Sequence, residues 1–495
     1  MPEVREQPTE EVEDVGEKLR VCRVCGSPNP IDDTNFCNNC WVPLTHADLI
    51  PQAEAESRFY QRRQRLFKNK PLVYSVALVV GLILWRVIVA WDVFYMVVPP
   101  PKPANVISVY DGSGAWGQAG RTTQNTAFIP ESPPVPGKVE WTFSVVPGST
   151  NPAPPRVISA PSVVGERVFL TTDDGRAVAL DLNTGALLWE YETGEPSTAP
   201  PAVAAGLVFF SSRPGQVFAL DWSTGELRWQ VDLESNIVAP PIIAEGRAYV
   251  GTADNILYAL DATTGRRLWR FDSSSWVVSQ VAYSDGSLVV TTTGSVVHVL
   301  NAETGREQFI YDTGRGRNLY GSASILDDTA YIASHRGSLT AVKWDLSSVP
   351  LERRIWSARV KMAVWWSIFD PPVQKGTVWI SRMGGRIIRS PAVDGDKVYA
   401  SVKDGRVVAL DARSGELRWE SQVGGEITTG PVVAGDTVLV GTKKGHIAGI
   451  DAETGALAWD FKTGDSEITS SPIVSGGIIL AAARDGTLYA ITVGE

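Results

Sequence analysis

The sequence predicts an all-β protein built as an eight-bladed β-propeller, and its internal repeat is the main reason. The motif Ala-x-Asp-x-x-Thr-Gly-x-x-x-Trp begins at Ala179 and returns five more times with small changes. Its third position falls, at a step of 40 residues within each run, on Asp181, Asp221, Asp261, Asn301, Asp411 and Asp451. A period of roughly 40 to 50 residues with short strands and glycine turns is typical of propeller blades. The hydrophobic content of 44% fits a globular domain, and the net charge of −10 argues against nucleic-acid binding.

Each repeat is expected to contain three or four strands joined by tight turns. In the second repeat, strands are expected over residues 208–211, 217–220 and 227–230. The Asp-x-x-Thr-Gly turn joins the last two, because glycine accepts positive φ and the Asp carboxylate can cap the turn. The Trp is a large apolar plate that can pack between neighbouring blades. We therefore interpret the repeated Asp and Trp residues as structural.

The two ends of the repeat region predict how the ring closes. The last unit, residues 471–491, contains the early strands and then stops without the turn or the Trp. A lone late strand that contains Trp141 stands before the first complete unit, over residues 139–144. A last blade split between the two termini would seal the ring and leave no free sheet edge. Seven complete units, one of them degenerate around Lys343, and the split unit make eight blades.

The fifth blade contains about 30 extra residues, and two alignments compete for it. Either Trp356 is the Trp of that blade and the insertion follows it, or Trp379 is. We favour Trp379, because it precedes Pro391 by the same distance as Trp419 precedes Pro431. The insertion then spans about 345–374, inside a hairpin on the face that carries the Thr-Gly turns.

The insertion is rich in basic and aromatic residues, which are typical of contact surfaces. It is the best candidate in the chain for contact with a protein partner or lipid, and packing of the insertion against the propeller rim is an equal alternative. The candidate contact residues are Arg353, Arg354, Trp356, Trp365, Trp366 and Phe369.

All four cysteines lie near the N-terminus in two C-x-x-C pairs: Cys22, Cys25, Cys37 and Cys40. A C-x-x-C turn presents two thiolates to one ion, and four thiolates complete the tetrahedron of a structural zinc site. A segment this short has no core of its own, so the metal would supply its folding energy. A redox pair or two disulfides are the alternatives, and a reducing cytoplasm disfavours the disulfides. We therefore expect a zinc ribbon without an open catalytic position.

An apolar run over residues 72–91 predicts one transmembrane helix. The run is apolar except for Ser75 and Arg86, and it is long enough for one hydrocarbon core. Six Lys or Arg residues lie between positions 58 and 70, and few charges follow the run. The positive-inside rule then places the N-terminus in the cytoplasm and the propeller outside the cell membrane. Arg86 either snorkels to the outer interface or contacts another membrane helix.

These features predict a simple domain order. It comprises an acidic disordered tail (1–19), a zinc ribbon (20–46), a basic juxtamembrane segment (47–70), a transmembrane helix (71–98), a Pro-rich linker with a lead-in segment (99–137), and the propeller (138–495).

The repeat resembles that of the pyrroloquinoline-quinone (PQQ) propeller family, over about residues 116–493. Trp116-Gly-Gln-Ala-Gly120-Arg resembles the lead-in segment of these propellers. Cys25-Gly-Ser-Pro-Asn-Pro30 resembles the small zinc ribbons of bacterial membrane proteins. Some members of the propeller family are dehydrogenases that hold the quinone and calcium at the ring centre, and others are non-enzymatic scaffolds. The dehydrogenases typically carry an adjacent Cys-Cys pair, and residues 41–495 contain no cysteine. We therefore expect zinc but not PQQ as a cofactor.

Three functions remain as hypotheses. The favoured one is a membrane-anchored, extracytoplasmic propeller that acts as a non-catalytic binding or assembly scaffold for a protein partner. The second is a PQQ-dependent membrane oxidoreductase. The third is a transmembrane sensor, in which the propeller binds a ligand and the zinc ribbon reports it. The sequence contains no P-loop, GxSxG or HExxH motif, so it favours a non-enzymatic protein.

Overall fold

The computed structural model describes residues 18–23, 27–29, 37, 44, 47–59, 61, 74–82, 101–107, 115–145, 157–314, 318–348, 352–366, 372–387 and 389–493. The chain divides into two compact units, residues 1–99 and 100–495.

The first unit contains a three-stranded antiparallel sheet in the order β2-β1-β3. Its strands are β1 (Lys18–Val21), β2 (Pro28–Asn29) and β3 (Asp48–Pro51). Residues 52–59 and 74–82 are helical. Of the predicted membrane span 72–91, only this second helical stretch is described; the described residues include no helix that is long and apolar enough to cross a membrane.

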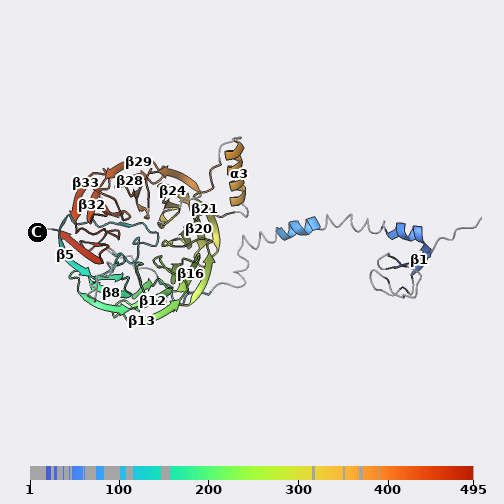
Figure 1. Ribbon diagram of the computed structural model, residues 1–495, viewed down its shortest axis with the longest axis horizontal. Helices are drawn as coiled ribbons and strands as arrows, with labels where there is room; N and C mark the ends of the chain where they lie inside the picture. The colour runs from blue at the N-terminus through green and yellow to red at the C-terminus, as the bar shows by residue number, and fades with distance from the viewer. Residues whose placement is uncertain are drawn as a thin grey trace, which may run out of the picture. The chain divides into compact units, whose positions relative to one another are not determined.

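The described strands of the second unit form eight sheets, each with four antiparallel strands, arranged around a common axis (Figure 1). The prediction of an all-β propeller is therefore confirmed. The first four sheets are β6 (Ser162–Val164), β7 (Arg167–Thr171), β8 (Arg176–Asp181), β9 (Leu187–Glu192); β10 (Ala202–Ala204), β11 (Leu207–Ser211), β12 (Gln216–Asp221), β13 (Leu227–Asp232); β14 (Ile242–Ala244), β15 (Arg247–Gly251), β16 (Ile256–Asp261), β17 (Arg267–Asp272); β18 (Ala282–Ser284), β19 (Ser287–Thr291), β20 (Val296–Asn301) and β21 (Glu307–Asp312).

The second half of the ring repeats this pattern, with a fifth strand, β4, added to the seventh sheet. The sheets are β22 (Ser324–Leu326), β23 (Thr329–Ala333), β24 (Ser338–Lys343), β25 (Thr377–Arg382); β26 (Ala392–Asp394), β27 (Lys397–Ser401), β28 (Arg406–Asp411), β29 (Leu417–Gln422); β4 (Phe128–Ile129), β30 (Val432–Ala434), β31 (Thr437–Gly441), β32 (His446–Asp451), β33 (Leu457–Lys462); β34 (Ile473–Ser475), β35 (Ile478–Ala482), β36 (Thr487–Val493) and β5 (Pro136–Ser144).

The burial of the strands follows their place in the ring. The first strand of each sheet, here called the inner strand, lies nearest the axis, and the last strand lies at the rim, where Figure 1 labels β13, β29 and β33. In the second sheet, β12 is buried along its length except at its two ends, whereas β13 is largely exposed with a buried residue at Trp229. The core therefore lies between the sheets, and the rim strand contributes mainly its Trp.

Each sheet meanders, so its turns alternate between two faces of the ring. In the second sheet, residues 205–206 and the Thr-Gly turn 222–226 lie on one face, here called the turn face. Residues 212–215 and the connection 233–241 to the next sheet lie on the other face, here called the cavity face.

The repeated Trp and Gly residues join neighbouring sheets. Trp189 Nε1 donates to the backbone oxygen of Trp222 at 3.0 Å, and a Cβ added to Gly225 would lie 2.8 Å from the Trp189 ring. Gly225 also has φ of 75°. Only glycine combines this backbone conformation with room for the ring. The same pairing recurs at Trp229 with Gly265, Trp269 with Gly305, Trp379 with Gly415, and Trp419 with Gly455.

The lone strand closes the ring as predicted. Strand β5 pairs with β36 in antiparallel register, with Trp141 opposite Ala490. Trp141 Nε1 donates to Leu182 O at 2.9 Å, and a Cβ on Gly185 would lie 2.6 Å from its ring. Trp141 therefore makes the joint that the C-terminal residues lack. The strand begins at Pro136, two residues before the predicted propeller boundary.

The fifth sheet confirms Trp379 as its repeated Trp. Trp379 lies opposite Ala341, just as Trp229 lies opposite Ala219 in the second sheet. The insertion therefore lies in the hairpin between β24 and β25, on the turn face. It contains the helix α3 (Glu352–Trp366), which the repeat pattern does not predict.

Candidate functional site

The insertion forms a protrusion at the rim of the ring, where α3 stands beside β21 (Figure 1). Arg353, Arg354, Trp365 and Trp366 belong to α3, but their side chains are outside the described part of the structure, as is the whole of Phe369. The remaining candidate, Trp356, is half-buried, and its Nε1 donates to Pro372 O at 3.0 Å. Trp356 therefore holds α3 against the returning chain of the insertion itself, and this bond does not decide between a partner contact and packing against the rim.

A groove of about 350 Å³ lies between α3, β21 and the segment that leads to β25. Its walls include Phe309 and Ile310 of β21 and the half-buried Trp356. Two apolar side chains at its edge face water: Ile355 is 58% exposed and Val373 is 78% exposed. Exposed aliphatic side chains beside an apolar groove are typical of contact surfaces.

Two charged side chains fix one end of this groove. Lys375 Nζ donates to Ser347 O at 2.8 Å and lies 3.4 Å from Glu352 Oε1. Glu352 is in the first turn of α3, where a negative charge favours the helix. Arg359, one turn beyond Ile355, is exposed at the same groove. The groove therefore combines an apolar floor with a basic edge.

The linker is bound to the same face of the ring. Ala104 N donates to Asp261 Oδ2 at 2.5 Å, and Gly246 N donates to Ile107 O at 2.6 Å. This cover makes Asp261 1% exposed, whereas the equivalent Asp221 is half-buried. Because Gly246 and Asp261 belong to turns of the third sheet, residues 101–107 lie on the turn face.

The lead-in segment, residues 115–129, crosses the ring axis and bonds to every inner strand. Seven inner strands each donate one backbone N–H to it: from Val163 to Trp116 O, Val203 to Gly117 O, Ile243 to Gln118 Oε1, Tyr283 to Thr123 O, Ile325 to Gln124 O, Val393 to Thr126 O and Val433 to Ala127 O. Trp116 Nε1 donates to Val474 O of the eighth inner strand at 2.7 Å. Without the lead-in segment, these backbone N–H groups of the inner strands would have no partner within the protein. The segment therefore completes the hydrogen bonding of the inner strands.

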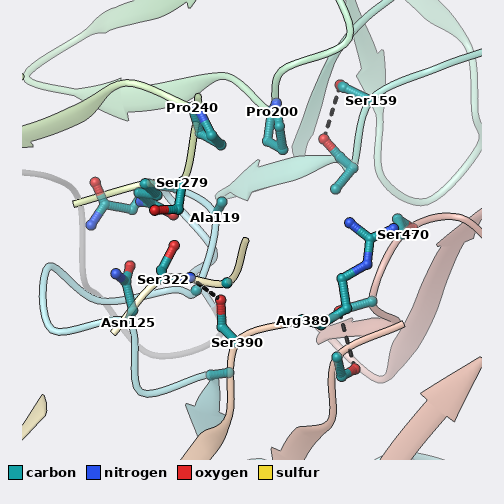
Figure 2. Close-up of a pocket in the computed structure, with 18 of the residues that line it drawn as sticks. Ala119, Asn125, Ser159, Pro200, Pro240, Ser279, Ser322, Arg389, Ser390 and Ser470 are labelled. Carbon is teal, nitrogen blue, oxygen red and sulfur yellow. Dashed lines mark hydrogen bonds between the residues drawn. The ribbon is translucent and has the colours of Figure 1, made fainter. Parts of the chain in front are cut away.

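A central cavity of about 440 Å³ lies between the lead-in segment and the cavity face of the ring, and it opens on that face. Its wall comes from the connections that precede the inner strands (Figure 2). Serines recur there: Ser159, Ser279, Ser322, Ser390, Ser470 and Ser471. Among the described lining residues, Arg389 is the one charged side chain. The cavity wall is therefore polar, although the hydroxyls of Ser159, Ser279 and Ser471 already donate to backbone oxygens.

The predicted zinc ligands are described only in part. Cys22 and Cys37 are both buried and pack together with Leu44, so one cysteine of each C-x-x-C pair lies in the same cluster. Asn29 Nδ2 is 3.6 Å from Cys37 Sγ. Cys25 and Cys40 are outside the described residues, and within the described ones no group of three or more His, Cys, Asp or Glu could hold a metal ion. The zinc site remains a prediction.

The fold has several known counterparts among solved structures. BamB from Moraxella catarrhalis is 19% identical and covers 71% of this chain and 98% of its own, with a TM-score of 0.55. Quinohemoprotein alcohol dehydrogenase from Comamonas testosteroni is 14% identical and covers 78% of this chain and 82% of its own, with a TM-score of 0.61. The computationally designed Ika8 protein is 18% identical and covers 68% and 97%, with a TM-score of 0.57. At these identities the similarity shows the fold alone.

Comparison with curated proteins finds no match. A PQQ-repeat family model, described as outer membrane protein assembly factor BamB, matches residues 134–200, 183–275, 257–388 and 367–495. These matches overlap and together span the whole ring of sheets. The chain therefore belongs to the PQQ-repeat family described as outer membrane protein assembly factor BamB.

Proposed function

We propose that this protein is a non-catalytic scaffold, in which an eight-bladed propeller presents the α3 protrusion to a protein partner. The protrusion carries the proposal. In the six other sheets whose third and fourth strands are consecutive in the chain, a tight turn joins these strands, whereas between β24 and β25 the chain adds a helix and a groove. The exposed Ile355 and Val373 offer apolar area that a partner would cover. The family description, an assembly factor, agrees with such a role.

The chemistry of the central cavity supports binding over quinone-dependent oxidation. The calcium ion that accompanies the quinone in dehydrogenases prefers carboxylate and carbonyl oxygens. The described lining residues supply hydroxyls, amides and one guanidinium, and none of them is a carboxylate. A guanidinium repels a cation. Because the amide oxygens are neutral and no lining carboxylate balances the ion, these residues do not fit a calcium-bound quinone, and we derive no step through that group.

The proposed scaffold is held at the cell membrane with its N-terminus in the cytoplasm. In the helical residues 74–82, the side chains of Tyr74, Val76, Leu78, Val79, Val80 and Leu82 are exposed. An apolar helix surface of this kind is stable in lipid and not in water. The basic residues that precede it support the inside orientation, and the packing of Cys22 with Cys37 supports a structural zinc on that side.

Chemical crosslinking in intact membranes tests the scaffold. We expect the full chain to give one dominant crosslinked partner, which Ile355→Glu and Val373→Glu each weaken. Leu417→Glu is the matched control, because Leu417 is 59% exposed at the rim of the sixth sheet and does not line the groove. The scaffold proposal would be wrong if no protein is crosslinked, or if the two groove variants and the control behave alike.

The oxidoreductase is tested on the same purified chain. Adding PQQ and calcium should produce neither a visible chromophore nor dye reduction. A chromophore that depends on calcium would contradict our interpretation of the cavity.

A further inference from the structure

Arg389 lies in the wall of the central cavity without a carboxylate to neutralise it. It is in the connection before β26, and its guanidinium is held by two backbone oxygens. Arg389 Nε donates to Thr428 O at 3.2 Å, and Nη2 donates to Thr469 O at 3.3 Å. These acceptors lie in the connections that precede the seventh and eighth inner strands. The guanidinium is therefore fixed in place, and two bonds leave its other N–H groups for a ligand.

The surroundings of Arg389 favour an anion. Within the described residues no carboxylate lies within ion-pair distance of Arg389, and the nearest source of negative charge, Glu467, pairs instead with Arg484 at 2.7 Å. The side chain reaches water through the cavity mouth, yet the protein atoms around it remove enough water to lower its pKa. Guanidinium groups stay charged in proteins, so a bound anion in the cavity would pair with this charge.

Two buried amides, Gln118 and Gln280, lie in the wall of the same cavity. Gln118, in the lead-in segment, is 1% exposed; its Oε1 accepts from Ile243 N, which directs Nε2 away from that strand. Gln280 is 4% exposed. In the described part of the chain neither Nε2 has a hydrogen-bond partner, and the one such acceptor in the cavity is Asn125 Oδ1. A buried donor without a partner costs about 1–3 kcal/mol, so a ligand towards which either amide can turn to donate is favoured.

We propose that the central cavity binds a small anion at Arg389, to which Gln118 and Gln280 donate once their amides turn towards the ligand. The ligand class is a molecule or chain end with a carboxylate or phosphate group, because their oxygens match the fork of a guanidinium. The cavity of about 440 Å³ lies within the usual range for small-molecule sites. Figure 2 shows Arg389 and Ser470 on one side of the cavity and Ser279 and Ser322 on another, so hydroxyls surround the proposed site.

This site does not depend on the scaffold function, since it lies on the cavity face and α3 lies on the turn face. It is tested by calorimetric titration of the purified full chain at low ionic strength. The probes are citrate, inorganic phosphate, acetate, and a hexapeptide with either a free or an amidated C-terminus. We expect at least one probe to bind, and we expect the affinity of every probe that binds to fall at high salt. Binding of the free-acid peptide alone would identify a chain terminus as the ligand and would support the site.

Variants locate the binding. Arg389→Gln should weaken the best probe at least tenfold, and Gln280→Leu should weaken it several-fold. Arg386→Gln is the matched control, because Arg386 is exposed on the same connection but does not line the cavity. Arg389→Lys keeps the charge but loses the two-pronged geometry, so it should bind more weakly than the parent and more tightly than Arg389→Gln. The proposal is overturned if no probe binds, or if Arg389→Gln and Gln280→Leu both bind like the parent chain.

Discussion

Replacing Gly225 by Ala should destabilise the propeller by about 1–5 kcal/mol. At φ of 75°, an alanine costs about 1–2 kcal/mol relative to the right-handed conformation. Its methyl group would lie 2.8 Å from the Trp189 ring, and overpacking of this kind costs about 1–3 kcal/mol. The reduced freedom of the unfolded chain offsets about 0.4–1 kcal/mol of the sum. The free energy of unfolding of the full chain in urea, followed by far-ultraviolet circular dichroism, measures the effect.

Gly286→Ala separates the two causes. Gly286 has φ of 74°, but nothing lies within 4 Å of the Cβ it would gain. It should therefore cost only the backbone strain, about 1 kcal/mol after the offset. In a chain that already carries Trp189→Ala, Gly225→Ala should cost no more stability than Gly286→Ala does in the parent chain, because the ring is then absent. Equal losses for Gly225→Ala and Gly286→Ala would refute the view that the repeated glycine exists to seat the Trp of the preceding sheet.

Three further results are expected. Hydrogen bonds from Ser414 N and then Arg418 lower the pKa of Asp411 to about 2, below its usual 3.8. The stability that ionised Asp411 contributes is therefore present above pH 3.8 and lost as the pH falls towards 2. Asp411→Asn should remove this pH dependence from the free energy of unfolding and still cap the turn, since Asn301 caps the equivalent turn of the fourth sheet. Trp141→Ala should cost about 2–4 kcal/mol and make the C-terminal residues sensitive to protease, because the ring closes through that side chain. The purified full chain should contain about one zinc per chain by elemental analysis, and Cys22→Ser or Cys37→Ser should lower this content while leaving the unfolding of the propeller unchanged.

The closure of the ring could be predicted because side chains encode it. Trp141 and Trp379 occupy the same position relative to a glycine turn as the other repeated Trp residues, and the geometry of that joint is the same in each sheet. Where an interaction requires one residue type at one spacing, a single sequence reveals it. This is also why Trp379 could be chosen over Trp356 from spacing alone.

The lead-in segment shows the opposite case. Its resemblance to other propellers could be recognised from Trp116 and Gly120, but its path across the axis could not. Most of its bonds to the inner strands use backbone oxygens such as Gly117 O and Thr123 O, which any residue supplies. The position of Arg389 in the cavity could not be predicted for a related reason: it lies outside the repeated motif, and only the fold brings it to the cavity wall. For α3 a local signal existed, since Ala, Arg, Lys and Met in Glu352–Trp366 favour helix.

The two faces of the ring differ in how much of their surface the chain itself occupies. On the turn face, residues 101–107 cover the third sheet, and the chain that leaves the axis passes the eighth and seventh sheets, where Glu131 accepts from Gly477 N at 2.7 Å and Ser132 lies against Gly435. The insertion with α3 extends from this face as well. The lead-in segment separates these contacts from the central cavity, whose mouth is on the other face. A partner at α3 and an anion at Arg389 would therefore approach from opposite sides, so neither should exclude the other, and a variant that abolishes one should leave the other intact.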